Sequence, residues 1–221
     1  MGLMLRKRCP VLLVFFLLVS LFAVSAQENG GGDGGDDVPI ESDWDSGPVT
    51  LYTAGDKTFS IAIGALFPVL FLNNDWQPYA QNYPIGNINI GATGSLSFNY
   101  FLSPHLFVGG EIQGMFAGTL GGNMLYIVPM GIKAGYQFIA GRFEFPLSLM
   151  VGMAPQTYSN NVGYFGFFLK PQGSAFWRFN PEWSFGLNAG WWFVPQWPAT
   201  GPEHNRYGNF VELTLAARYH F

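Results

Sequence analysis

The sequence predicts an eight-stranded antiparallel β-barrel that spans a membrane, and three observations predict it. From residue 55 onward, apolar and polar residues alternate with a period of two in eight segments. The connections between these segments are alternately short and mostly longer. The charged residues within the segments all fall on the polar side of the alternation. A closed sheet with an apolar outer face and a polar lumen has all three properties.

The composition excludes several other classes of protein. Only 11% of the 221 residues are charged, against about 25% in soluble domains, so few charges are available to cover a soluble surface. The 49% of hydrophobic residues exclude a disordered chain, and the single cysteine excludes an intrachain disulfide scaffold. The net charge of −4 argues against a nucleic-acid partner, which would require a basic surface.

Residues 1–26 have the features of a cleaved signal peptide. Basic residues at 6–8 precede an apolar run over 11–24, and we expect cleavage after Ala26. The alternative is an uncleaved membrane anchor, but the run is shorter than the ~20 residues that a spanning helix needs. Cys9 lies before the run, whereas a lipoprotein cysteine would follow it, so acylation is not expected. The mature chain would contain no cysteine, which suits an exported protein.

Residues 27–54 are predicted to form a flexible leader rich in glycine and acidic residues. Seven carboxylates and no basic residue occur between positions 27 and 49. Within this stretch, residues 31–38 match one calcium-binding nonapeptide repeat. Such repeats bind calcium only when several are stacked, so a linker is the preferred interpretation. The predicted barrel then occupies residues 55–221.

The first four predicted strands alternate clearly. In 59–64 the odd positions are large and apolar and the even positions are small. In 88–100, 106–116 and 128–138 the apolar residues fall mainly on even positions, while odd positions hold mostly polar residues and glycine. Each segment therefore has one apolar face and one polar face when extended.

The last four predicted strands have their apolar residues on odd positions, as 59–64 does. In 143–153, 165–178, 183–193 and 211–221, odd positions carry most of the apolar side chains, and even positions hold most of the polar ones. These segments are also separated by clusters of turn-forming residues.

The connections support a barrel independently of the alternation. Three are tight turns by composition, at 103–105, 140–141 and 180–182. Four are mostly longer, at 73–87, 117–124, 155–163 and 195–206. Outer-membrane barrels of bacteria have short periplasmic turns and longer external loops, so the short turns are expected on the periplasmic side.

Charge decides which face of the sheet contacts lipid. A soluble barrel would have to cover its exterior with the few charged residues of the polar face, and such a surface would aggregate. We therefore predict that the polar face lines the lumen and that the apolar face contacts hydrocarbon. The predicted lumen charges are Glu111, Lys133, Glu144, Lys170, Arg178, Glu212 and Arg218.

The final strand carries a family resemblance. It contains Leu213, Leu215, Ala217 and Tyr219 and ends at Phe221. On these residues the chain resembles the small eight-stranded outer-membrane proteins of diderm bacteria, of the OmpW and OmpA/OmpX class. The resemblance implies an outer-membrane location, contact with outer-membrane lipid, and an assembly signal at Tyr219 and Phe221 for the barrel assembly machinery. An OmpW-like member would pass small hydrophobic molecules sideways from the lumen to the membrane.

Two functional classes remain open. An eight-stranded interior is about wide enough for side chains to fill, so a wide pore is not expected. A transporter of a small hydrophobic ligand would need a pocket and a break in the wall. A surface anchor or adhesin, which could bind a host surface, would need only its external loops. The predicted loop contacts are Trp76, Tyr79, Tyr83 and Trp197, although interfacial aromatics commonly have a purely structural role.

Catalysis is not predicted. His105, His204 and His220 are the only histidines, and they are placed at a turn, a loop and the final strand. No motif indicates a nucleophile, a metal site or a cofactor site. The sequence therefore predicts neither an enzyme nor a cofactor.

Reflecting neighbouring strands about their connections gives two finer predictions. The first places Glu111 beside Lys133 as a buried ion pair, with separate solvation by lumen water as the alternative. The second places Pro146 beside Pro171, where two missing hydrogen-bond donors would form a lateral seam in the wall. The alternative to the seam is that the two prolines lie at separate bulges in a closed wall.

Overall fold

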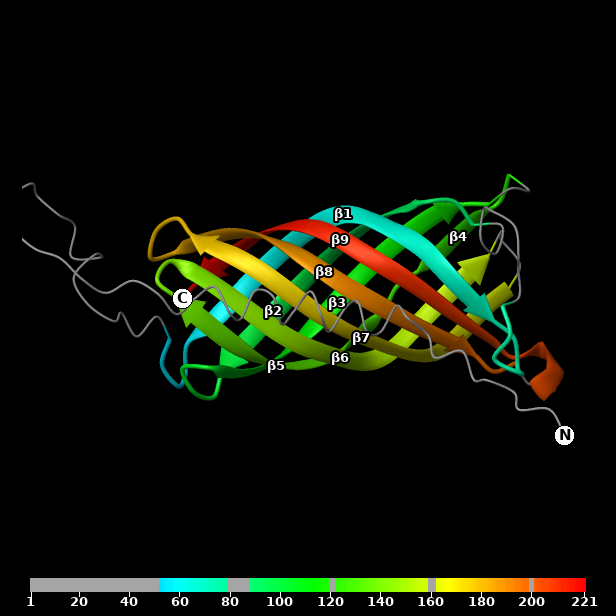
Figure 1. The fold of residues 1–221 in the computed structure, drawn as a ribbon, viewed down its shortest axis with the longest axis horizontal. Helices are drawn as coiled ribbons and strands as arrows, with labels where there is room; N and C mark the ends of the chain where they lie inside the picture. The colour runs from blue at the N-terminus through cyan, green and yellow to red at the C-terminus, as the bar shows by residue number, and fades with distance from the viewer. Residues whose placement is uncertain (1–51, 79–87, 120–121, 159–161, 199–200) are drawn as a thin grey trace, which may run out of the picture. The chain divides into compact units, whose positions relative to one another are not determined.

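The computed structural model describes residues 52–78, 88–119, 122–158, 162–198 and 201–221, which form a β-barrel of tilted strands (Figure 1). The barrel belongs to the compact unit Pro48–Phe221. The expected signal peptide and most of the expected leader lie outside the described residues. The strands are β1 Lys57–Leu72, β2 Gly91–Phe101, β3 Leu106–Gly118, β4 Met124–Ile127, β5 Met130–Ala140, β6 Phe143–Tyr158, β7 Val162–Arg178, β8 Trp183–Gln196 and β9 Arg206–His220.

The sheet closes into a barrel with eight strand positions around the ring. Strand β1 pairs with both β2 and β9, and every pairing around the ring is antiparallel. Strands β4 and β5 lie end to end and together fill one strand position, because both pair with β3 on one side and with β6 on the other. The predicted eight-stranded antiparallel barrel is confirmed. A closed ring of this kind leaves no strand edge to be satisfied by water.

The division between β4 and β5 is explained by Pro129, which has no N–H to donate to the ladder. The wall remains hydrogen-bonded on both sides of the break. The Val128 amide donates to the Pro155 carbonyl at 2.9 Å, and the Gln113 amide donates to the Pro129 carbonyl at 2.8 Å. A second proline, Pro68, coincides with a register shift between β1 and β9. Prolines in this wall therefore break a strand or shift its register without opening the sheet there.

Short turns and longer loops lie at opposite ends of the barrel. The turns after β2, β5 and β7 are at the end that holds the C-terminus, and the 3-10 helix η2 Pro202–His204 lies at the other end (Figure 1). The predicted loop over 155–163 is wrong, because β6 continues to Tyr158 and β7 begins at Val162. Pro155 lies within β6 opposite Phe165.

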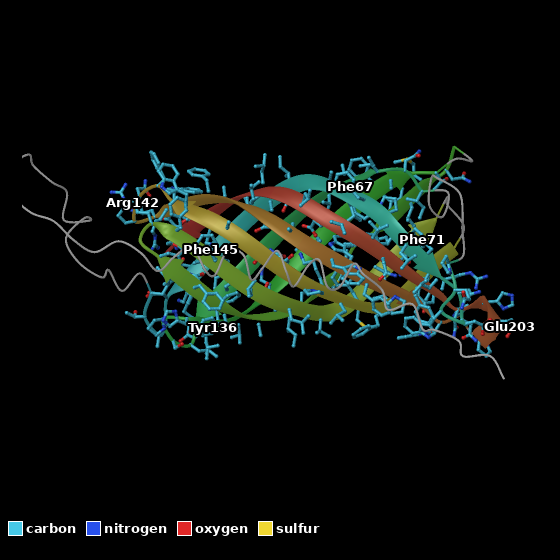
Figure 2. The ribbon with its side chains drawn as sticks, in the orientation of Figure 1. Phe67, Phe71, Tyr136, Arg142, Phe145 and Glu203 are labelled. Carbon is cyan, nitrogen blue, oxygen red and sulfur yellow. The ribbon has the colours of Figure 1, made fainter. Side chains whose placement is uncertain are left out.

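The outer wall of the barrel is apolar. Ile132 on β5 is 75% exposed and Leu215 on β9 is 65% exposed, and similar side chains project along the wall, Tyr136 among them (Figure 2). Such a surface is favourable only in contact with hydrocarbon. Within the described ranges, no helix is long and apolar enough to cross a membrane.

Candidate functional site: the filled lumen

The lumen is filled by side chains of two kinds. The half near the long loops holds an apolar core, in which the rings of Phe168 and Trp192 meet edge to face at 5.1 Å between centroids. The buried members of this core are Leu66, Met115, Ala117, Leu125, Ile127, Met150, Ala154, Phe168, Trp192, Val194 and Phe210. The remainder of the lumen is mainly polar and contains buried charges, together with two small apolar clusters, Tyr52, Phe101 and Phe107, and Ala62, Phe176 and Ala216.

Sequence reasoning missed this apolar core. The alternation assigns Phe167 and Trp191 to the outer face but does not predict that their large apolar neighbours, Phe168 and Trp192, point inward. The available signal was a run of apolar residues on both parities, as in 191–194. Such runs indicate a strand that is apolar on both faces.

A central charge cluster lies next to the apolar core. Glu111 on β3 accepts from both Lys133 on β5 and Lys170 on β7, with each N–O distance 2.5 Å. Lys170 also lies 3.6 Å from Glu212 on β9, which accepts a hydrogen bond from the Trp192 indole. The two acidic and two basic side chains balance. Buried charges are tolerated when they are paired and hydrogen-bonded in this way.

A second charge cluster lies at the short-turn end. Arg218 on β9 donates to Glu144 on β6 at 3.0 Å, and the Arg178 Nε atom on β7 lies 3.7 Å from the same carboxylate. Gln137 on β5 donates to the Glu144 carboxylate at 3.4 Å. Three strands therefore converge on Glu144, which is fully buried. The cluster joins side chains across the lumen as well as along the wall.

The structure places all seven predicted lumen charges inside the barrel, where each is buried. It brings Glu111 and Lys133 together, as the reflection of their strands predicts. The reflection did not predict Lys170 and Glu212 as further members of that cluster. The polar residues Gln113, Ser184 and His220, which the alternation also assigns to the polar face, line the lumen as well.

The predicted juxtaposition of Pro146 and Pro171 is wrong. The register of β6 and β7 sets Pro171 opposite Leu149, three positions along β6 from Pro146. Pairing is interrupted at Pro146 between β6 and β7, and at Pro171 between β7 and β8. Successive residues of a strand direct their N–H groups alternately to the two neighbouring strands. Leu149, which is opposite Pro171, is an odd number of residues from Pro146, so the two missing donors lie on different strand pairs.

Two of the predicted loop aromatics are exposed. Trp76 is 59% exposed and stacks on Tyr207 with its ring centroid 4.5 Å away. Trp197 is also exposed, and its amide donates to the Tyr164 hydroxyl at 2.6 Å. Tyr79 and Tyr83 lie outside the described residues. The structure does not bring Trp76 and Trp197 into one described contact.

The predicted assembly residues, Tyr219 and Phe221, lie on the outer wall at the short-turn end. They line an apolar groove of about 390 Å³ together with Phe59, Ile61, Trp183 and Ala217. In the part of the chain that the structure describes, no group of three or more His, Cys, Asp or Glu residues could hold a metal ion.

The closed antiparallel ring, the apolar outer wall and the charges buried in the lumen define the class of small outer-membrane β-barrels. The structure of Neisserial surface protein A is similar with a TM-score of 0.53 and 10% identity, covering 76% of this chain and 97% of that one. The outer membrane protein OprG from Pseudomonas aeruginosa is similar with a TM-score of 0.50 and 11% identity, covering 79% and 99%. At this identity the likeness establishes the fold alone.

The chain belongs to the protein family whose model matches residues 41–219, a family without an assigned function. An uncharacterized protein of Treponema pallidum (strain Nichols) is 27% identical over 126 residues, which are 57% of each chain. An uncharacterized protein of Borreliella burgdorferi is 25% identical over 160 residues, covering 63% of this chain and 73% of that protein. The match to the Treponema protein thus spans little more than half of its length.

Proposed function

We propose that the protein is an integral outer-membrane barrel whose lumen is closed to solutes and which anchors surface segments in the membrane. The filling of the lumen along its length carries this proposal. Trp192 in the apolar core, Lys170 in the central cluster and Glu144 at the short-turn end are each at most 1% exposed. A water-filled pore would leave inward side chains hydrated.

The competing role is lateral release of small hydrophobic molecules, as the OmpW resemblance implies. It requires an internal pocket and an opening in the wall. The interruptions at Pro146 and Pro171 lie on different strand pairs and so do not combine into one opening. The anchor is therefore the better supported role. Its partners would be outer-membrane lipid, the barrel assembly machinery during insertion, and a host or other surface reached by the long loops.

Solute flux across liposomes that contain the refolded protein tests this proposal. We expect vesicles with the wild-type protein to swell in small sugars no faster than empty vesicles, and to take up an apolar dye no faster. Replacing Trp192, Lys170 and Glu144 with Ala removes one side chain from each filled part of the lumen and should raise the swelling rate, whereas replacing Phe168 and Trp192 alone should not. Swelling or dye uptake with the wild-type protein would contradict the proposal and favour transport.

A matched control separates an opened lumen from a disturbed wall. Phe185 and Leu187 lie on β8 as Trp192 does, but both are exposed on the lipid face. Replacing both with Ala removes similar apolar volume outside the barrel, so the swelling rate should stay at that of wild type. A shift in gel mobility between the unheated and the heated protein verifies that each variant is folded.

A further inference from the structure

Tyr52 lies ahead of β1 and inserts its side chain into the short-turn end of the lumen. It is 1% exposed although it belongs to no strand. Its ring stacks on Phe101 with centroids 4.0 Å apart, and Phe107 completes the same buried cluster. The guanidinium of Arg178 lies 5.0 Å from the ring centroid, within cation–π distance. The ring therefore occupies the end of the lumen that the second charge cluster reaches.

The Tyr52 hydroxyl also completes a directed chain of hydrogen bonds. It donates to Glu144 at 2.7 Å and lies 3.1 Å from Nδ1 of His220. Because a hydroxyl has one hydrogen, Nδ1 must be the donor of the second bond. Nε2 of the neutral imidazole then accepts from the Ser184 hydroxyl at 2.7 Å. Burial raises the pKa of the Tyr52 hydroxyl, so it stays protonated and remains a donor.

A short turn directs Tyr52 into the lumen. The Thr53 amide donates to the Asp56 carboxylate at 2.7 Å, and Gly55 adopts a φ of 106° that favours glycine. The Gly55 amide donates to the Phe101 carbonyl of β2 at 2.9 Å, which ties the turn to the wall. Tyr52 itself lies outside the ladder, so moving it breaks no strand pairing. Its side-chain contacts and the turn that follows it oppose its withdrawal.

We propose that Tyr52 is a removable stopper that closes the short-turn mouth of the lumen. With Tyr52 in place, Ser184, Glu144 and His220 are sealed from water. With Tyr52 withdrawn, these polar groups would be hydrated at the mouth, while the central cluster and the apolar core would stay closed. The stopper is thus a conformational device at one mouth and does not require a conducting lumen.

Cysteine labelling of the refolded chain tests the stopper. Residues 27–221 contain no cysteine, so an introduced cysteine is the single thiol of that chain. Ser184→Cys places a thiol at the mouth, and we measure its rate of reaction with a water-soluble maleimide. The rate should be low with Tyr52 present and at least about tenfold higher with Tyr52→Ala, because labelling follows the open fraction. Rapid labelling with Tyr52 present would overturn the proposal, and so would equal rates in the two folded proteins.

Three controls make the result specific to the mouth. Thr214→Cys places a thiol deeper in the lumen and should stay unlabelled in both backgrounds. Tyr136→Ala removes an exposed aromatic from the outer wall and should leave Ser184→Cys protected. Tyr52→Phe keeps the ring but not the hydroxyl and should label more slowly than Tyr52→Ala. If Tyr52→Ala does not fold, Tyr52→Leu replaces it, and labelling no faster than with Tyr52 would again overturn the proposal.

Discussion

Glu111 is the residue on which the central charge cluster depends, because it accepts from two lysines. Glu111→Gln leaves Lys133 and Lys170 facing a neutral amide in a buried site, which should lower the free energy of unfolding by about 3–5 kcal/mol. Lys133→Gln leaves Glu111 still paired with Lys170 and should cost clearly less. Urea unfolding in lipid vesicles, followed by tryptophan fluorescence, measures both losses.

The exposed Glu203 provides the control for this comparison. It lies outside both buried clusters, and Glu203→Gln should change the free energy of unfolding by less than about 0.5 kcal/mol. Equal losses for Glu111→Gln and Lys133→Gln would show that Lys170 contributes nothing to holding Glu111. The central cluster would then reduce to one isolated pair.

The sequence predicts part of this cluster and no more, for a geometric reason. Parity assigns Glu111 to the lumen, and reflection of adjacent strands sets it beside Lys133. Lys170 lies on β7, which is not a neighbour of β3 in the sheet. Contacts across a lumen depend on the curvature and stagger of the closed barrel, which alternation along one strand does not contain.

Strands β5 and β6 approach closely where two glycines face each other. Gly131 pairs with Gly152, and a Cβ atom on either would lie 2.2 Å or less from a backbone carbonyl oxygen of the other strand. Because backbone cannot move aside as a flexible side chain can, Gly131→Ala should destabilise the barrel by about 1–3 kcal/mol. Gly114→Ala is the matched control, since nothing lies within 4 Å of its Cβ position.

The urea midpoint of refolding tests this pair. A lower midpoint for Gly131→Ala, with an unchanged or higher one for Gly114→Ala, is the expected result, because alanine also restricts the unfolded chain. If both substitutions leave the midpoint unchanged, the two strands are held less closely than the structure indicates.

Prolines explain why the sequence predicts the strands better than their ends. The expected segments 88–100 and 183–193 lie largely within β2 and β8, where alternation is regular. The composition predicts loops that begin at Pro155 and Pro195, yet each proline lies inside a paired strand. A proline lacks a donor but keeps its carbonyl, and the Pro155 carbonyl accepts from Val128 across the break between β4 and β5.

The whole barrel is expected to have one orientation in the membrane, with short turns in the periplasm and long loops outside. Glu203 in η2 and Glu182 in the turn before β8 are exposed residues at opposite ends. In intact cells, a membrane-impermeant maleimide should label Glu203→Cys and leave Glu182→Cys unlabelled until the outer membrane is permeabilised. The reverse pattern would mean that the long loops face the periplasm.

The pairing of β1 with β9 has a consequence for how the protein can be made. Thr58 near the start of β1 pairs with His220 at the end of β9, so the first strand of the barrel cannot complete its pairing until the last one has been synthesised. Until β9 arrives, a partly inserted sheet would present two rows of unpaired amides and carbonyls to hydrocarbon, which cannot hydrogen-bond them. Insertion and ring closure must therefore occur together, or the edge strand of another sheet must hydrogen-bond to the growing one until the ring closes.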